Sequence, residues 1–338
     1  MILLRISLSF FQQTRYNHAD IRSTVSFLQK EKVLVTGAAG FIGSNLSRKL
    51  LEKGYQVIGL DNLSTGRLEN LGGLENETDF NFIEGDINDL DLLMDVMSDV
   101  GHVLHQAAIP SVPRSVSDPL TSNKANIDGT LSVLVAAKES DVKKVVMASS
   151  SSVYGDSETL PKHEGMEYNP LSPYALNKLT CELYCKIFTD LHGLQTACLR
   201  YFNVFGPHQD PKSEYAAVIP RFITTIANDA SPTIFGDGTQ TRDFTFVEDV
   251  AEANIRAMTS DATGNFNIAG GSRISLLELV KTINDILGKD VEPFFEETRA
   301  GDIKHSLADI SKAKEAFGYS PIYSLEQGLR RTAEWFTN

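Results

Sequence analysis

Gly37-Ala38-Ala39-Gly40-Phe41-Ile42-Gly43 is the stretch that decides the predicted fold. It follows the short β-branched run Val33-Leu34-Val35 and opens an amphipathic segment that predicts a helix over residues 42–51. Glycines at this spacing allow a tight turn and a close backbone approach, and the N terminus of the helix that follows favours a pyrophosphate. The strand, turn and helix together predict a dinucleotide site made by Gly37, Gly40, Phe41, Ile42 and Gly43.

Strands and helices then alternate along the chain. Further strands are predicted over residues 55–60, 80–84, 102–105, 144–147 and 196–200, and helices over 89–97, 126–138 and 174–191. This order predicts an α/β fold with a doubly wound parallel sheet, the Rossmann architecture. Glycine and proline become frequent further on, so residues 206–338 are predicted to form a smaller mixed α/β substrate-binding lobe, with some segments returning to the first domain. Residues 32–205 are the predicted nucleotide-binding domain, and residues 1–31 an N-terminal extension.

Composition narrows the class of partner. The 338 residues carry a net charge of −13, which disfavours a nucleic-acid or anionic-membrane surface because either needs a broad basic face. The apolar start lacks a basic region and a cleavage pattern and is too short to span a membrane, so we interpret it as an extension rather than a leader. The three cysteines, Cys181, Cys185 and Cys198, lack the paired spacing of a zinc site, so no metal site is predicted. We expect them to be reduced thiols that pack in the interior of a cytoplasmic protein.

Asp61, at the end of the second strand, is the next candidate in the nucleotide site. Its carboxylate can accept hydrogen bonds from an adenosine ribose and would repel a 2′-phosphate, which indicates NAD rather than NADP. The alternative is a turn-starting aspartate in Asp61-Asn62-Leu63-Ser64. By the same geometry, residues after the third and fourth strands and one on the long helix are expected in the crevice: Asp86, Ile87, Gln106, Ala107, Ala108 and Asn126.

A tyrosine and a lysine predict the chemistry. Tyr174 and Lys178 are four residues apart on a predicted helix and therefore share a face. A nearby cation favours a phenolate and lowers its pKa from about 10 toward neutrality, so Tyr174 is a plausible base for an alcohol. The serine run 149–152 offers a second hydroxyl. The alternative, a surface tyrosine and lysine, is disfavoured by the glycine turn and the serine run upstream.

From about residue 32 to its end, the chain resembles extended short-chain dehydrogenases/reductases, and within them the nucleotide-sugar 4-epimerases. It looks most like UDP-N-acetylglucosamine 4-epimerases. The motifs that carry this resemblance are Gly37–Gly43, Asp61-Asn62, Asp86, His105-Gln106-Ala107-Ala108, Ser149 through Gly155, Tyr174 with Lys178, Arg200 through Gly206, Arg242 through Val247 and Arg299-Ala300-Gly301-Asp302. It implies NAD as cofactor, with Asn62, Tyr174, Lys178 and Tyr201 also touching it, and Ser150 as the catalytic serine.

The resemblance also implies a nucleotide-sugar clamp. Asn203, Arg242 and Arg299 would hold the diphosphate, Asp302 the ribose, Val218 and Phe235 the base, and Ser150 and Ser151 the sugar. At Ser306 the family has a bulky tyrosine in enzymes restricted to UDP-glucose and UDP-galactose, and a small residue in those that accept N-acetylated sugars. The alternative for Ser306 is the start of a helix near Asp309.

The expected function is NAD-dependent C4 epimerisation of UDP-GlcNAc and UDP-GalNAc by transient 4-keto oxidation and re-reduction, with UDP-glucose and UDP-galactose open as further substrates. One alternative is an epimerase restricted to those plain sugars. A remoter one is an idle NAD-binding sensor, disfavoured because the Tyr/Lys/Ser set is kept. A dehydratase is disfavoured because Ser150–Ser152 replace that branch's Thr-Asp-Glu. In the family, helices 126–138 and 174–191 pair into a four-helix bundle, so a homodimer is expected.

Overall fold

The structure, a computed structural model, describes residues 30–211, 217–298 and 304–337. The chain divides into Met1–Glu31 and Lys32–Asn338, and all the elements below belong to the second unit. Among the described residues, no helix combines the length and the apolar character that crossing a bilayer requires.

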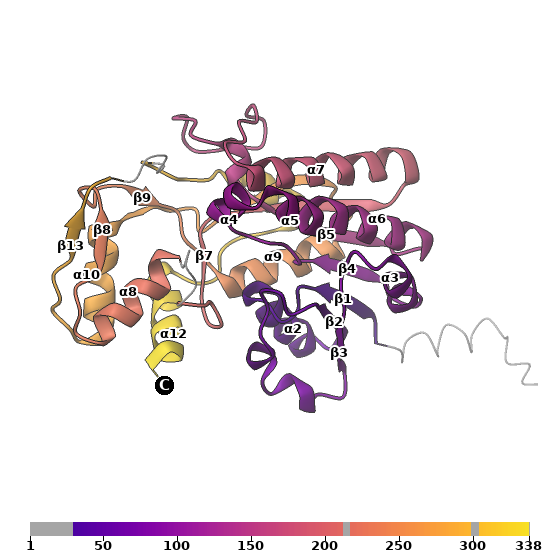
Figure 1. The fold of residues 1–338 in the computed structure, drawn as a ribbon, viewed down its shortest axis with the longest axis horizontal. Helices are drawn as coiled ribbons and strands as arrows, with labels where there is room; N and C mark the ends of the chain where they lie inside the picture. Colours follow the sequence, from indigo (N-terminus) through magenta and orange to yellow (C-terminus); the bar gives the residue numbers. More distant parts are fainter. Residues whose placement is uncertain (1–29, 212–216, 299–303, 338) are drawn as a thin grey trace, which may run out of the picture. The chain divides into compact units, whose positions relative to one another are not determined.

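A parallel sheet of seven strands forms the centre of this unit, in the order β11-β6-β5-β4-β1-β2-β3 (Figure 1). The strands are β1 (Lys32–Thr36), β2 (Gln56–Asp61), β3 (Phe80–Glu84), β4 (His102–His105), β5 (Lys144–Ser150), β6 (Gln195–Tyr201) and β11 (Gly264–Ile268). The predicted doubly wound Rossmann fold is confirmed. Strand β11, which comes from the second half of the chain and pairs with β6, was not predicted.

Helices cover both faces of the sheet. They are α2 (Phe41–Glu52) and α9 (Val247–Thr259) on one face, and α3 (Leu90–Met97), α6 (Gly129–Glu139) and α7 (Pro173–His192) on the other. Alternation along β1 explains the two layers, since Val33 and Val35 pack toward the first layer and Leu34 toward the second. The three cysteines are unpaired and buried, and they pack in the second layer.

The helix predicted over residues 126–138 is present, and its first residues belong to a π-helical turn that runs directly from a preceding helix into α6. A π-helical turn at Lys124–Asp128 precedes α6, and two short helices, α4 (Val112–Ser117) and α5 (Pro119–Asn123), precede that turn. Each of these short helices has a proline in its first turn, where a missing backbone N–H costs nothing.

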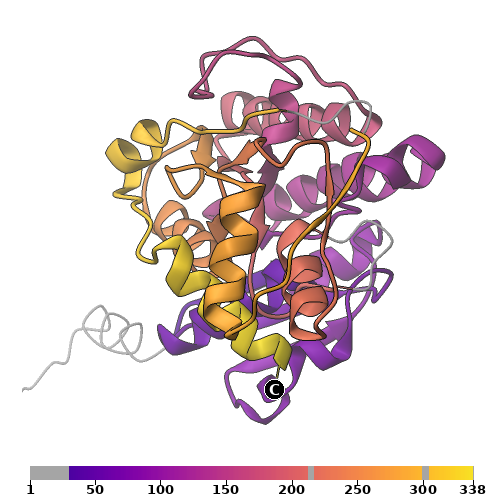
Figure 2. The same ribbon diagram turned by 90° about the vertical axis from the view of Figure 1, so that its left-hand side faces the viewer.

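The second half adds a smaller lobe, which faces the viewer in Figure 2. Its elements are β7 (Val204–Phe205), α8 (Val218–Ala227), β8 (Thr233–Phe235), β9 (Thr241–Arg242), β10 (Thr245–Phe246), β12 (Ile274–Ser275), α10 (Leu276–Leu287), β13 (Phe294–Glu296) and α12 (Leu325–Thr337). Ile223, Leu279 and Leu329 from α8, α10 and α12 are fully buried together in its core. Helices α9 and α11 (Ser311–Phe317) pack on the large sheet and β11 belongs to it, so the second half of the chain also completes the first.

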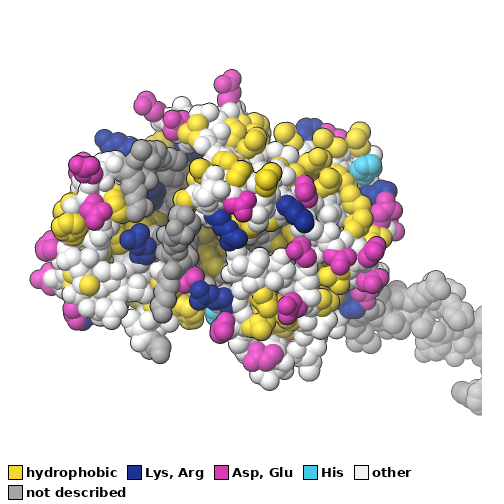
Figure 3. Space-filling view, in the orientation of Figure 1, with side chains coloured by type: hydrophobic (Ala, Val, Ile, Leu, Met, Phe, Trp, Pro, Cys, Tyr) yellow, Lys and Arg dark blue, Asp and Glu magenta, His cyan; other side chains and the backbone are white. Residues whose placement is uncertain are grey.

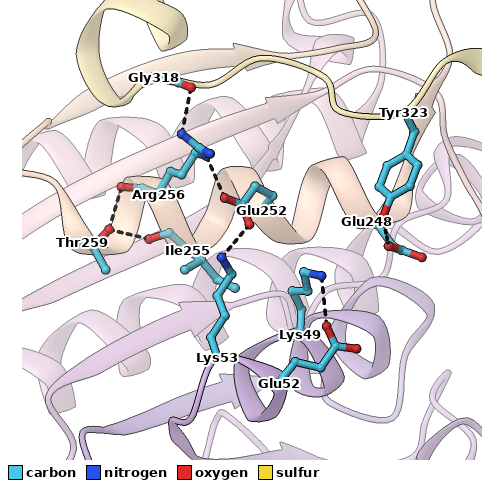
Figure 4. A network of polar contacts seen from close by, with 10 residues as sticks. All are labelled: Lys49, Glu52, Lys53, Glu248, Glu252, Ile255, Arg256, Thr259, Gly318 and Tyr323. Carbon is cyan, nitrogen blue, oxygen red and sulfur yellow. Dashed lines mark hydrogen bonds and ion pairs between the residues drawn. The ribbon is translucent and has the colours of Figure 1, made fainter.

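A polar network fastens α9 to its neighbours (Figure 4). Glu252 accepts from Lys53, at the end of α2, with 3.0 Å between Nζ and Oε2. Its other oxygen accepts from Arg256 Nε at 2.8 Å, and Arg256 Nη1 donates to the Gly318 carbonyl at 3.0 Å. The network therefore ties α2 and the end of α11 to the same helix.

Candidate active site

The glycine turn has no room for side chains. Gly37 has a φ of +70°, and a Cβ there would lie 2.7 Å from the Ala107 nitrogen. A Cβ on Gly43 would lie 2.0 Å from the Gly37 carbonyl oxygen. Gly40 is the N-cap of α2 and has no side chain to accept from the first-turn N–H groups, which include those of Phe41 and Ile42. An anion such as a pyrophosphate can accept these hydrogen bonds instead.

Asp61 lies beside this turn at the carboxyl end of β2. Its two oxygens accept from the backbone N–H of Ala39 at 3.0 Å and of Leu63 at 2.8 Å. Burial raises the pKa of its carboxyl, and the two N–H groups act in the opposite direction. A carboxylate oxygen can accept more than one hydrogen bond, so Asp61 can still accept from ribose hydroxyls.

The next two predicted cofactor residues meet at the ends of β2 and β3. Asn62 Nδ2 donates to Asp86 at 2.9 Å. Burial works to raise the pKa of Asp86, but the hydrogen bonds from Asn88 and Asn62 prevail and lower it. Ile87 is buried so close to α6 that a Cβ on Gly129 would lie 2.4 Å from its Cδ1.

A second group of predicted cofactor residues lies at the ends of β4 and β6. Asn126, from the π-helical turn, accepts from the Ile109 N–H at 2.8 Å and so holds the segment after Ala107 and Ala108. The Tyr201 hydroxyl donates to Gln106 Oε1 at 3.1 Å, and Gln106 Nε2 donates to Asn254 at 3.0 Å. Asn254 comes from α9, and the sequence analysis did not identify it.

His105 is a further residue that the sequence analysis did not assign a role. Its ring nitrogens lie 2.7 Å from Thr36 Oγ1 and 3.0 Å from Thr130 Oγ1. Burial, together with the charge of Lys178, lowers its pKa to about 3, so the imidazole is neutral at physiological pH. Thr36 Oγ1 also accepts from the Ala107 N–H, and the neutral imidazole therefore helps to hold the cofactor crevice.

Ser150 and Tyr174 come together as predicted for a catalytic pair. Ser150 ends β5 and is hydrogen-bonded to the Tyr174 hydroxyl. Tyr174 lies in the first turn of α7, which Ser172 caps by accepting from the Ala175 N–H. The backbone N–H of Tyr174 donates to Ser115 Oγ at 3.0 Å. Ser151 follows Ser150 and begins the 3-10 turn Ser151–Tyr154.

The pKa of Tyr174 is not lowered in the way that its spacing from Lys178 predicts. Its ammonium is 6.0 Å from the centroid of the Tyr174 ring and donates to the Ala148 carbonyl at 2.7 Å. Burial raises the pKa of Tyr174 to about 12 despite the hydrogen bond with Ser150, and burial lowers the pKa of Lys178. The predicted lowering of the Tyr174 pKa by Lys178 is therefore wrong for these residues by themselves, because desolvation outweighs the interactions that favour the phenolate.

Three predicted substrate residues gather around Thr241–Asp243. Arg242 Nη1 donates to the carbonyls of Thr241 at 3.0 Å and Lys304 at 3.3 Å. The Ser306 N–H donates to the Thr241 carbonyl at 3.0 Å, and Asn203 Nδ2 donates to the Asp243 carbonyl at 2.8 Å. Helix α11 begins at Ser311, so the alternative in which Ser306 starts a helix is wrong.

The other substrate predictions fall elsewhere. Val218 opens α8 and Phe235 ends β8, both in the smaller lobe. Arg299 and Asp302 lie outside the described residues. Asp243, which the sequence analysis did not assign, is fully buried and accepts from the Ala308 N–H at 3.1 Å. Burial raises its pKa to about 7. Its place directly after Arg242 was the only signal for it.

The chain belongs to the NAD dependent epimerase/dehydratase family, whose model matches residues 33–269. It is 42% identical, over 90% of its length and 98% of the relative's, to a putative UDP-glucose 4-epimerase of Methanocaldococcus jannaschii. It is also similar to the solved UDP-N-acetylglucosamine 4-epimerase of Methanobrevibacter ruminantium M1 in complex with UDP-N-acetylmuramic acid. That similarity is 44% identity and a TM-score of 0.88, over 91% of this chain and 99% of the other. A UDP-glucose 4-epimerase of Thermus thermophilus solved with NAD is 34% identical with a TM-score of 0.82, over 91% and 99% of the two chains.

These comparisons confirm three of the predictions. The chain is an enzyme of the epimerase family within the extended short-chain dehydrogenases/reductases, and it uses NAD. The structure fits that cofactor, because the glycine turn leads directly into the N terminus of α2 and Asp61 is hydrogen-bonded to Ala39 of the same turn.

Proposed function

We propose that this protein is a UDP-sugar 4-epimerase that interconverts UDP-GlcNAc and UDP-GalNAc. The observation that carries the choice of sugar is Ser306, whose backbone N–H bonds to Thr241, directly beside Arg242. A serine in place of a tyrosine frees on the order of one ring's volume, enough for an acetamido group. The 44% identity to a UDP-N-acetylglucosamine 4-epimerase supports the same substrate.

Tyr174 is the proposed base. Its hydroxyl is the form present at neutral pH in the protein alone, because burial raises its pKa to about 12. NAD, when bound, would supply the acceptor for the hydride from C4 of the sugar. In its oxidised form it would also supply a positive charge that favours the Tyr174 phenolate. Tyr174 then takes the proton of the sugar's 4-hydroxyl and later returns it, with Ser150 completing the hydrogen bonds. The Lys178 charge, buried nearby, stabilises the ionised phenol.

The diphosphate is assigned to Arg242 and Asn203. A guanidinium offers two parallel, charge-assisted hydrogen bonds to phosphate oxygens. Asn203 adopts a φ of +37°, a left-handed conformation that asparagine tolerates better than most residues. Its hydrogen bond to the Asp243 carbonyl places it beside Arg242.

Asp61 is expected to make the wild-type protein prefer NAD over NADP by at least about tenfold in affinity, because the carboxylate repels a 2′-phosphate. Asp61→Ala should narrow that difference. Titration of cofactor-depleted protein with NAD and NADP measures it. Asp91→Ala, which removes an exposed carboxylate from α3, is the matched control and should leave the ratio unchanged. Equal wild-type affinities for the two cofactors would contradict the assignment.

An epimerase restricted to UDP-glucose and UDP-galactose is the second candidate. It is favoured by the 42% identity to a protein named as a putative UDP-glucose 4-epimerase. The kcat/KM values on UDP-glucose and UDP-GlcNAc distinguish the two, since discrimination is a difference in transition-state binding.

We also propose that the protein acts as a homodimer in the cytoplasm. Apolar side chains gather over α4, α5 and α7 in the upper right of Figure 3. The exposed ones are Val112, Val116, Leu120, Leu176, Leu183, Ile187 and Leu191. Four of them recur along one face of α7 at helical spacing, so a second copy of the same face would bury them in a helix bundle. Helix α6 was predicted to form this bundle together with α7, but the α4–α5 segment contributes more exposed apolar side chains to the face than α6 does.

This face predicts the oligomeric state. Leu183→Glu/Ile187→Glu should convert a dimer of about twice the chain mass into a monomer, because paired carboxylates cannot be buried there. Size-exclusion chromatography with light scattering measures the mass. Leu68→Glu, at an exposed apolar side chain outside the face, is the control. A monomeric wild type would contradict the proposal.

A further inference from the structure

A fully buried ion pair lies beneath the catalytic residues. Arg200 of β6 and Glu182 of α7 have side chains that are 0% and 1% exposed. Two hydrogen bonds join them: Nη2 to Oε2 at 2.6 Å, and Nε to Oε1 at 2.8 Å. Removing two charges from water is costly, and a well-packed apolar pair in their place is often at least as stable. Stability alone therefore does not explain this ion pair, and its other hydrogen-bond partners indicate its role.

Glu182 connects the two elements that carry the catalytic hydroxyls. It lies one helical turn after Lys178 on α7, the helix that also carries Tyr174. Its Oε1 accepts from Ser149 Oγ at 2.5 Å, and Ser149 directly precedes Ser150 in β5. The carboxylate thus links the residue before Ser150 to α7, about two helical turns after Tyr174.

Arg200 holds the segment that follows. Its Nη1 donates to the Tyr154 hydroxyl at 2.8 Å, and its guanidinium carbon lies 4.9 Å from the centroid of the same ring. Tyr154 ends the 3-10 turn that begins at Ser151, and its hydroxyl donates to Asn267 of β11 at 2.6 Å. The chain is therefore held on both sides of Ser150 by one ion pair.

We infer that Glu182 and Arg200 are positioning residues for proton transfer, because through Ser149 and Tyr154 they fix Ser150 against Tyr174. The inference rests on the proposed roles of Ser150 and Tyr174. It does not depend on which UDP-sugar is the substrate. If the pair served stability alone, an apolar replacement that preserved the fold would also preserve turnover.

Ser149→Ala is the first test. It removes the hydrogen bond to Glu182 but no charge, and it leaves Arg200 paired. We expect kcat per bound NAD to fall about tenfold on UDP-GlcNAc or UDP-glucose, whichever turns over faster, with KM nearly unchanged. The acid limb of the kcat–pH profile should also move to higher pH, because the bond from Ser150 lowers the pKa of Tyr174. The titratable groups that face Tyr174, namely Lys178, Cys181 and Tyr201, stay in place.

Glu182→Met/Arg200→Met is the second test. We expect its bound NAD and melting temperature to match or exceed those of the wild type, while kcat falls at least about tenfold. Lys53→Met/Glu252→Met removes the ion pairs that Glu252 of α9 makes with Lys53 and with Arg256, and it serves as the control that should keep wild-type kcat.

Wild-type kcat with an unshifted pH profile in Ser149→Ala overturns the inference, and so does wild-type kcat in the folded Met/Met variant. If the Met/Met variant does not fold, Ser149→Ala decides alone. The proposed function fails separately: in that case Tyr174→Phe would retain turnover, whatever the Ser149 result.

Discussion

Tyr174→Phe is expected to lower kcat by about 10²–10⁴-fold while NAD remains bound, since that is the usual contribution of a positioned base. Only the hydroxyl is removed. The ring keeps its packing, and the backbone bond from Tyr174 to Ser115 is unaffected. Turnover is followed by resolving the 4-epimers of the UDP-sugar, and bound NAD is measured after denaturing the protein.

Tyr184→Phe is the matched control for this variant. It makes the same change on the same helix, at a partly buried tyrosine that packs in the second layer of the core. Its kcat should stay near that of the wild type. Near-wild-type turnover in folded, NAD-containing Tyr174→Phe would remove Tyr174 as the base.

Ser306→Tyr is expected to abolish most activity on UDP-GlcNAc while activity on UDP-glucose is kept or increased. The tyrosine ring would occupy the space proposed for the acetamido group, beside Thr241 and Arg242. Filling this space should change the ratio of the kcat/KM values for UDP-GlcNAc and UDP-glucose by about 10- to 200-fold. Steady-state kinetics of both substrates on the same preparation measures the ratio.

Ser306→Ala is the control here, because it keeps the position small and should preserve the preference for the acetylated sugar. If Ser306→Tyr leaves the ratio unaltered, Ser306 does not determine which sugar is accepted.

Much of the fold was predictable because its signals are local. The strand at Phe80–Glu84 and the one at His102–His105 occupy the predicted residues. β11 was missed because Asn265 and Asn267 interrupt its apolar pattern, and their partners, Glu182 and Tyr154, are distant in sequence. The π-helical turn at Lys124–Asp128 has a similar origin, since Asn126 is hydrogen-bonded to the backbone of Ile109.

In the candidate site, too, features with a local sequence signal could be predicted and most tertiary contacts could not. The glycine turn could be predicted, because it depends on spacing within one strand–turn–helix segment. The contact between Ser150 and Tyr174 joins β5 to α7, and it was expected from the resemblance to the epimerases. The bond from Ala308 to Asp243 joins residues that only the tertiary fold brings together, as does the bond between His105 and Thr36. The pKa of Tyr174 could not be predicted from its distance to Lys178 along the helix, because it depends on burial.

The most direct measurement of the central claim is to incubate the purified protein with UDP-GlcNAc, without added NAD, and to resolve the products by anion-exchange chromatography. We predict that UDP-GalNAc forms until the two epimers reach a constant ratio, and that kcat/KM is higher than for UDP-glucose under the same conditions. Formation of UDP-galactose from UDP-glucose with no UDP-GalNAc from UDP-GlcNAc would contradict the claim.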